Sequence, residues 1–238
     1  MPEIDISGLA GLRAKFANGP QARSNRLAFA TEESRLDLMG DIDAIFGISA
    51  ASIMSQLDQI AGGEIRLRIN SYGGDVLEGV AIHNALVAHP AKITAEIIGV
   101  AASAASWIAM AADEILIWEG AMMMIHNSWQ LLAGNKDMFA EAMAVLGKID
   151  DAMAAAYVRR TGLAEAEIRA MMDAETWLTA EEAVAKGFAN RMIAIGEPAT
   201  AIAARAELQK TRPASRTISP DVLAGLKSLA ASMAPTGG

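Results

Sequence analysis

The chain has 238 residues, a formal charge of −8 and no cysteine, and 53% of its residues are hydrophobic. This length allows one large domain with a sizeable core, and the acidic balance argues against nucleic acid or an anionic membrane as the main partner. Without cysteine the chain can form no disulfide, thiol nucleophile or cysteine-based metal site. We therefore expect a cytoplasmic protein that uses neither a metal nor another cofactor.

The two ends of the chain differ in composition from its middle. Residues 1–25 combine glycine, proline and scattered charge, which predicts a poorly ordered N-terminal arm. Glu3 and Asp5 stand where a secretory signal would carry cations, so no signal peptide is expected. Residues 198–238 are rich in alanine, arginine, serine, threonine and proline, which is typical of a low-complexity tail. The compact domain is expected over residues 26–197.

The first regular element that the pattern predicts is a strand over Glu64–Asn70, where isoleucine and leucine alternate with arginine. Such alternation indicates a strand with one buried face. Asp75 then has the position of a helix N-cap, and Glu78 follows three residues later as in a capping box. Pro90 is expected to end this helix.

The remainder of the domain is predicted to alternate between strands and helices. Strands are expected over residues 92–98, 114–118, 122–125 and 188–195, and helices over residues 101–112, 135–159 and 179–187. The last helix opens with Thr179 and Glu182, a second capping box. Repeated strand–helix units favour an α/β fold with a largely parallel sheet.

Three short stretches of this domain together predict an acyl-transfer site. A Gly73-Gly74 turn follows the first strand, Ser103 stands among alanines near the start of the predicted helix 101–112, and His126 follows an apolar strand. Unpaired N–H groups at a helix start favour developing negative charge, and strand ends often carry catalytic groups. A nucleophile, a base and backbone N–H donors are what peptide-bond hydrolysis requires.

Four motifs in this order resemble the Clp protease proteolytic subunit family, and in particular its phage or prophage members that mature virus heads. They are Asn-Ser-Tyr-Gly-Gly at 70–74, Gly-Val-Ala-Ala-Ser at 99–103, Met-Ile-His at 124–126 and Trp-Leu-Thr-Ala-Glu-Glu-Ala at 177–183. The resemblance spans the predicted domain. It implies a Clp protease/crotonase-like fold in which the helix from residue 135 projects as a handle.

The resemblance also implies an activity and partners. The expected activity is that of a serine endopeptidase that hydrolyses polypeptides inside a homo-oligomeric ring of seven subunits, with two rings stacked handle to handle. An AAA+ unfoldase is a further expected partner in those relatives that work with one. Neither nucleic acid nor membrane is expected.

Catalytic roles carry over from the family by register. Ser103 is the expected nucleophile and His126 the expected base. Glu175 stands where the family usually has aspartate and is the expected acid of the triad, with Asp173 as the alternative. The role of this acid would be to orient the imidazole and to stabilise its protonated form.

Binding roles are implied in the same way. The backbone N–H groups of Gly73 and Ala104 are expected to form the oxyanion hole, and no metal takes part. Gly74, Asp75 and Val76 correspond to the segment that pairs with an extended substrate as an added strand. Tyr72 departs from the family, which usually has proline at this position.

Three alternative functions remain open at this point. A crotonase-type acyl-CoA enzyme shares the general fold but has no need for a serine–histidine pair. An inactive ring subunit would not need Ser103, His126 and a nearby acid together. A serine–lysine peptidase would need a lysine at the site, and the nearest candidates in the sequence are Lys92 and Lys136.

Overall fold

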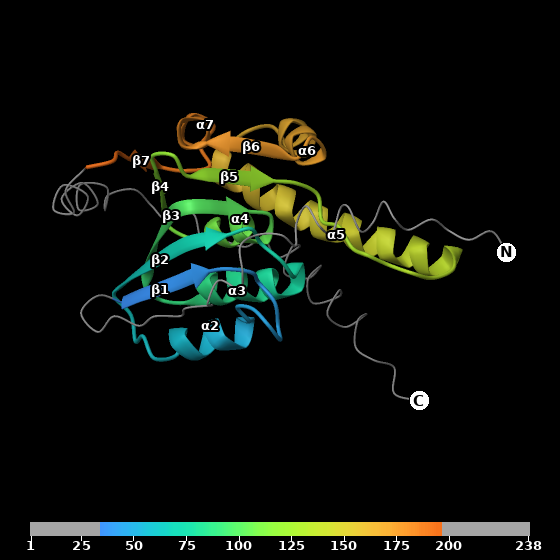
Figure 1. The fold of residues 1–238 in the computed structure, drawn as a ribbon, viewed down its shortest axis with the longest axis horizontal. Coiled ribbons are helices and arrows are strands. Elements are labelled where there is room, and N and C mark those ends of the chain that lie inside the picture. The colour runs from blue at the N-terminus through green and yellow to red at the C-terminus, as the bar shows by residue number, and fades with distance from the viewer. Residues whose placement is uncertain (1–33, 197–238) are drawn as a thin grey trace.

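A computed structural model describes residues 34–196 of the chain (Figure 1). The predicted arm (1–25) and tail (198–238) lie outside the described residues, so the proposed domain boundaries stay predictions. Strands and helices alternate along the described part, which confirms the predicted α/β class.

Seven strands of the described part form one sheet. They are β1 (Ser34–Met39), β2 (Glu64–Ser71), β3 (Lys92–Ala102), β4 (Glu114–Trp118), β5 (Met122–Ile125), β6 (Thr176–Thr179) and β7 (Arg191–Ile193). Five of them lie side by side in the order β1-β2-β3-β4-β7, and every pair among these is parallel. β5 is parallel to β3, and β6 is antiparallel to β5.

Six helices within residues 34–196 accompany the sheet. They are α2 (Ala50–Leu57), α3 (Val76–Ala88), α4 (Ala104–Ala109), α5 (Lys136–Thr161), α6 (Glu165–Asp173) and α7 (Ala180–Ala185). Figure 1 shows α2 and α3 along one side of the sheet, α6 and α7 beside β6, and α5 extending out of the body. β1, α2, α6 and β6 are elements that the sequence analysis did not predict.

The alternating sequence of β2 gives the strand one buried apolar face, as predicted, and one charged face. Ile65, Leu67 and Ile69 are buried in the core between the sheet and its helices. The arginines between them point to the other face, where Arg66 lies 3.4 Å from Glu96 and Arg68 lies 3.8 Å from Asp37. The period-2 pattern therefore identified both faces of this strand.

β3 is longer and α4 is shorter than predicted. We expected a strand over 92–98 and a helix over 101–112, but the strand continues to Ala102 and the helix covers only Ala104–Ala109. The reason is a second strand partner: β4 pairs with the first part of β3, and β5 pairs with Val100–Ala102. Small residues such as alanine fit both states, so tertiary pairing decided between them.

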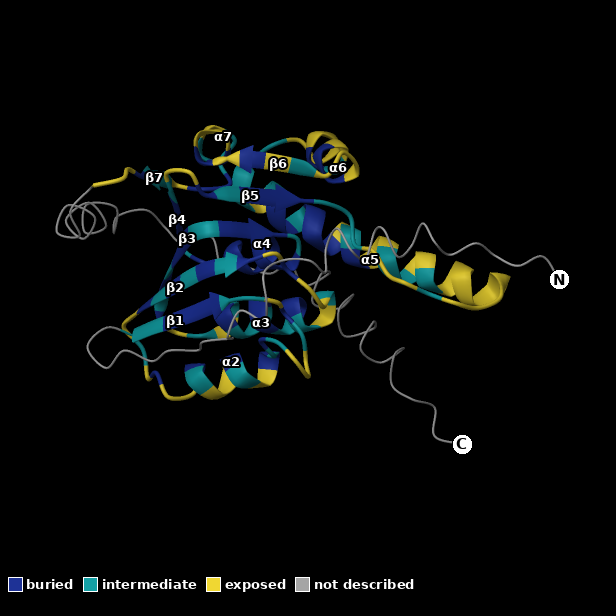
Figure 2. Cartoon of the chain, viewed as in Figure 1, coloured by how far each residue is buried: buried dark blue, intermediate teal, exposed yellow. Residues whose placement is uncertain are grey.

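α5 is half buried and half projecting. Asn135 caps its start through its side chain, and it ends at Gly162, which is in the left-handed conformation. Figure 2 shows the inner half buried and the outer half exposed, with Ile149, Met153 and Tyr157 among its buried residues. The predicted helix over 135–159 and its projection from the body are confirmed.

The two predicted capping boxes have different outcomes. Thr179 and Glu182 cap each other's backbone N–H groups, as predicted. Asp75 also caps α3, but Glu78 does not bond back to it. Its carboxylate instead accepts the N–H of Ala50 at 2.6 Å, because the first turn of α2 lies against α3 in the fold. Within residues 34–196, no helix is long and apolar enough to cross a membrane.

Candidate active site

Ser103 is the single residue between the end of β3 and the start of α4. Its backbone has φ 54° and ψ −128°, a left-handed conformation that a residue with a side chain rarely adopts. Its N–H donates to the carbonyl of Met124 on β5 at 3.0 Å, and its carbonyl accepts the N–H of Ser106 at 3.0 Å. Ser103 therefore lies at the start of a helix, as predicted, but as its N-cap, because Ala101 and Ala102 belong to the strand and the helix begins at Ala104.

His126 lies one residue beyond the end of β5 and faces Ser103. Its Nε2 is 2.7 Å from the Ser103 Oγ, a hydrogen-bond distance. The antiparallel strand β6 holds β5 on its other side. Partial burial lowers the pKa of His126, while the charges of Glu175 and Asp150 act to raise it. A neutral imidazole at this distance is able to accept the serine proton.

The two candidate acids occupy different positions around His126. Glu175 lies between α6 and β6 with φ 48°, again a left-handed backbone. Of the two carboxylates whose charges raise the pKa of His126, Glu175 has the larger effect and Asp150 the smaller. Asp173 accepts a hydrogen bond from the Asn127 side chain at 2.8 Å. Among the described residues, neither carboxylate forms a hydrogen bond with His126. Its charge on His126 favours Glu175 as the acid of the triad. Asp173 contacts Asn127, the residue next to His126, rather than His126 itself.

The other two histidines have structural contacts away from Ser103. His83 is buried beside Trp107, with 5.7 Å between ring centroids, and burial lowers its pKa to about 4. The His89 Nε2 lies 2.9 Å from the carbonyl of Ile60. Neither ring is at the site.

Gly73 and Ala104, the predicted oxyanion donors, lie together. A Cβ placed on Gly73 would come within 2.7 Å of the Ser103 Cβ and 3.0 Å of the Ala104 nitrogen, so only glycine fits here. The two donors are not equally available. The Ala104 N–H has no hydrogen-bond partner among the described residues, whereas the Gly73 N–H donates to the Ser71 Oγ at 3.1 Å.

The predicted substrate-pairing segment has one edge occupied by the chain itself. Ile42 donates its N–H to the carbonyl of Gly73 and accepts the N–H of Asp75, at 2.9 and 2.8 Å. The N–H and carbonyl of Gly74 point to the opposite side of an extended chain and have no partner among the described residues. Val76 packs against the core. Of the three residues, Gly74 is the one whose backbone is open to an added strand.

Several contacts at the site have no signal in the sequence. Asp150, on α5, acts on His126 through its charge and accepts the N–H of Ser128 at 2.6 Å. Asn127 bonds to Asp173, and Met124 contributes only its carbonyl. Asp150 and Asp173 come from segments distant from His126, and backbone groups are the same in every residue, so composition and spacing could not identify these contacts.

The lysines of the serine–lysine alternative lie away from Ser103. Lys92 begins β3, a strand of 11 residues that ends next to Ser103, and at about 3.3 Å per residue this separates the two by roughly 35 Å. Lys136 is at the outer end of α5 and pairs with Asp137. Neither can serve as the base.

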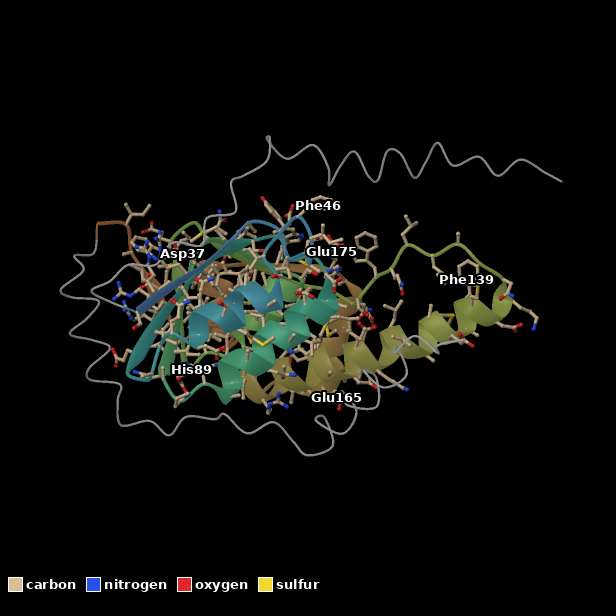
Figure 3. All side chains as sticks on the ribbon, turned by 90° about the horizontal axis from the view of Figure 1, so that it is seen from below. Asp37, Phe46, His89, Phe139, Glu165 and Glu175 are labelled. Carbon is tan, nitrogen blue, oxygen red and sulfur yellow. The ribbon has the colours of Figure 1, made fainter. Side chains whose placement is uncertain are left out.

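The C-terminal end of β2, which precedes Gly73, and β6, which follows Glu175, flank the site. A pocket of about 380 Å³ lies beside it, lined by Asn70, Tyr72, Gly99, Val100, Gly120, Met122 and Trp177. The Asn70 side chain reaches across to accept the N–H of Val100 at 3.2 Å. A Cβ on Gly99 would meet the Asn70 Oδ1 at 2.5 Å, so a larger residue here would displace the Asn70 side chain from this contact. Figure 3 shows Glu175 on the body of the molecule, well apart from Phe139 on the projecting part of α5.

Comparison with known proteins agrees with this arrangement. The family described as Clp protease matches residues 21–196. An ATP-dependent Clp protease proteolytic subunit from Deinococcus radiodurans is 29% identical over 151 residues, which cover 60% of this chain and 74% of the relative. Subunit 1 of the corresponding protein from Protochlamydia amoebophila is 29% identical over 185 residues, covering 73% and 87%. A relative from Nuphar advena is 31% identical over 130 residues, covering 52% and 63%.

The matched region contains every described strand and helix, with the mostly parallel sheet and helices expected of the Clp protease/crotonase-like fold. The predicted fold and enzyme class are both confirmed. The chain therefore belongs to the Clp protease family and is a serine-type peptidase.

Proposed function

We propose that the chain is a serine endopeptidase whose triad consists of Ser103, His126 and Glu175. The observation that carries the proposal is the 2.7 Å contact between the Ser103 Oγ and the His126 Nε2. A serine hydroxyl needs an adjacent base to attack a carbonyl at neutral pH. The partial burial of His126 supports its role, because burial lowers its pKa and keeps the ring neutral.

The proposed reaction follows from this geometry. The Ser103 Oγ attacks the carbonyl carbon of the scissile bond while its proton passes to the His126 Nε2. The tetrahedral oxyanion meets the free N–H of Ala104, and His126 then gives the proton to the leaving amine nitrogen. Water then attacks the acyl-enzyme carbonyl while its proton passes to the His126 Nε2. His126 returns this proton to the Ser103 Oγ as that oxygen leaves, which releases the acid product. Glu175 stabilises the protonated imidazole through its charge.

The second oxyanion donor would be the N–H of Gly73. This group donates to the Ser71 Oγ in the structure, so a substrate oxygen would take the place of the serine hydroxyl. An oxyanion is the stronger acceptor, since hydrogen bonds to charged groups are about twice as strong as neutral ones. The open backbone of Gly74 would pair with the substrate chain next to this point.

Labelling with a fluorophosphonate tests the proposed activity. We expect the full chain to gain one adduct, found on Ser103 by intact mass and peptide mapping. Ser52→Ala, on α2, is the matched control and should label like the unaltered protein. An assembled protein that gains no adduct would overturn the proposal. Binding of CoA would then be measured for the crotonase-type alternative.

The proposed acid is tested by charge-neutral substitutions of similar shape. Glu175→Gln removes a charge that raises the pKa of His126, so that pKa should fall further. Because the base works when neutral, the acid limb of kcat/KM against pH should move to lower pH. We also expect kcat to fall, since the imidazolium loses its counter-charge.

Asp173→Asn is the matched control for this prediction, because it keeps an acceptor for Asn127. It should leave the acid limb in place and reduce kcat far less. The opposite ranking of the two variants would assign the acid role to Asp173.

We further propose a homo-oligomeric ring of seven subunits, stacked in pairs through α5. The outer half of this helix supports this, because Met138, Phe139 and Met143 are exposed large apolar side chains. A projecting helix with such a face is poorly solvated unless another surface covers it. Burying the face between two rings would also enclose the active sites.

Charge on this face should separate the rings. Phe139→Glu with Met143→Glu is expected to halve the mass of the assembly measured by native mass spectrometry, because two carboxylates cannot be buried without partners. Met54→Glu, at a similarly exposed methionine on α2, should leave the mass unchanged. An unchanged mass in the α5 variant would argue against stacking through this helix.

The setting and partners are the remaining parts of the proposal. The resemblance to phage and prophage members supports maturation of head proteins as the natural role, and the names of the relatives support cooperation with an ATPase. The absence of cysteine supports a cytoplasmic location. Hydrolysis of an unfolded polypeptide without added ATPase would favour maturation of head proteins by this protein alone. A requirement for an unfoldase would favour cooperation with an ATPase.

A further inference from the structure

A pair of buried hydroxyl groups connects α5 to the backbone of Ser103. The Ser106 Oγ donates to the Ser103 carbonyl at 2.6 Å and lies 2.8 Å from the hydroxyl of Tyr157 on α5. Both side chains are 0% exposed, and they lie in the apolar core among residues such as Ile108 and Ala154. Burying two hydroxyls in such surroundings costs free energy unless they are hydrogen-bonded. The hydrogen bond between them therefore fixes the positions of both side chains.

The direction of this hydrogen-bond chain follows from the proton count. A carbonyl can only accept, so the one proton of Ser106 is directed at Ser103. Tyr157 must then donate its own proton to the Ser106 Oγ. Burial raises the pKa of Tyr157, so the phenol keeps this proton at neutral pH. A donor behind Ser106 polarises its hydroxyl and strengthens its bond to the carbonyl.

The carbonyl of Ser103 and the N–H of Ala104 belong to one peptide plane. Because that plane is rigid and trans, the two groups point in opposite directions. The carbonyl accepts the N–H groups of Ser106 and Trp107 at 3.0 and 3.3 Å and, at the shortest distance, the Ser106 hydroxyl at 2.6 Å. The hydrogen bonds that hold the carbonyl therefore also set the direction of the N–H. The backbone of Ser103 is strained at φ 54° and ψ −128°, and such a conformation persists only where its surroundings hold it.

The far end of α4 is attached to the same helix. The Arg160 guanidinium, one turn beyond Tyr157 on α5, donates to the carbonyls of Met110 and Ala112. Polar contacts from α5 thus hold both ends of α4. The helix that projects from the body is also the helix that fixes the segment carrying Ser103.

We propose that Ser106 and Tyr157 are positioning residues that aim the Ala104 N–H at the oxyanion by holding the Ser103 carbonyl. The inference rests on the proposed roles of Ser103 and Ala104. It assigns to α5 a part in catalysis besides its part in assembly, because a shift of Tyr157 would reach the oxyanion donor through a single intervening side chain.

The test compares activity with stability in variants of the full chain. Ser106→Ala should lower kcat roughly 5- to 30-fold with KM unchanged, and should slow fluorophosphonate labelling of Ser103 by a similar factor. It should also lower the Tm, because the Tyr157 hydroxyl is left unpaired. Tyr157→Phe should have a smaller effect on kcat, since Ser106 still donates to the carbonyl.

The double variant Ser106→Ala/Tyr157→Phe separates positioning from stability. Removing both hydroxyls leaves no unpaired group, so the Tm should recover toward that of the unaltered protein, while kcat and the labelling rate stay low. Ser52→Ala is the matched control, because the Ser52 Oγ makes the same contact with the carbonyl three residues earlier, at 2.7 Å, in α2. It should leave kcat unchanged.

A double variant with the kcat and labelling rate of the unaltered protein would overturn this inference alone. A double variant whose kcat recovers in parallel with its Tm would also overturn it, because Ser106 and Tyr157 would then have a purely structural role. Absence of labelling at Ser103 in the unaltered protein would overturn the proposed function, and this inference with it.

Discussion

Ser103→Ala is expected to lower the kcat for peptide hydrolysis on the order of 10⁶-fold while the assembly stays intact. The substitution removes only the Oγ, the atom that lies 2.7 Å from the His126 Nε2. Backbone contacts of Ser103 with Met124 and Ser106 do not involve the side chain of Ser103, so the local fold should persist. Hydrolysis of a fluorogenic peptide, with native mass spectrometry of the same sample, measures both parts of the prediction.

Two further measurements test whether the loss of activity in Ser103→Ala is specific to its hydroxyl. The Ser103→Ala protein should gain no fluorophosphonate adduct, and Ser52→Ala should retain both activity and labelling. If Ser103→Ala kept a substantial part of the activity, another residue would have to be the nucleophile, and the whole proposed site would be wrong.

Gly73→Ala is expected to have the second largest effect, a loss in kcat of about 10²–10³-fold. Gly73 has φ 94°, which is strained for any residue with a side chain. The added methyl would also meet the Ser103 Cβ at 2.7 Å and the Ala102 carbonyl oxygen at 2.8 Å. The turn must therefore shift away from Ser103, and its N–H can no longer reach the oxyanion together with that of Ala104.

A matched glycine distinguishes this effect from a general loss of glycine. Gly147 lies on an exposed position of α5 with space around it and no left-handed backbone. Gly147→Ala should leave kcat unchanged and raise stability by about 0.5–1 kcal/mol, because alanine is the better helix former. Full activity in Gly73→Ala would remove Gly73 from the oxyanion hole and leave Ala104 as the only proposed donor.

The acidic member of the proposed triad illustrates the limit of reasoning by register. Counting back from Thr179 predicted Glu175, with Asp173 as the alternative, and the structure adds that the charge of Glu175 acts on His126. What counting could not supply is the strained backbone of Glu175 at φ 48° or the contact between Asp173 and Asn127. Both depend on how α6 turns into β6, a strand that the sequence analysis did not predict.

Local pattern determined a large part of this protein from the sequence alone. Alternation identified the two faces of β2, Asp75 and Thr179 marked the starts of two helices, and the four motifs named the family. These features depend on neighbouring residues, through side-chain period, capping and turn geometry, so they can be read along the chain.

Tertiary structure alone decided the features that join distant segments. Pairing of β5 with Val100–Ala102 extended β3, moved the start of α4 to Ala104 and left Ser103 as a strained single-residue turn. The same packing placed Tyr157 behind Ser106, 51 residues away in sequence. Such contacts form because sheet pairing and core burial stabilise them over distances at which the sequence has no periodicity. For this reason the sequence could point to Ser103 as the proposed nucleophile, but only the fold shows what holds it.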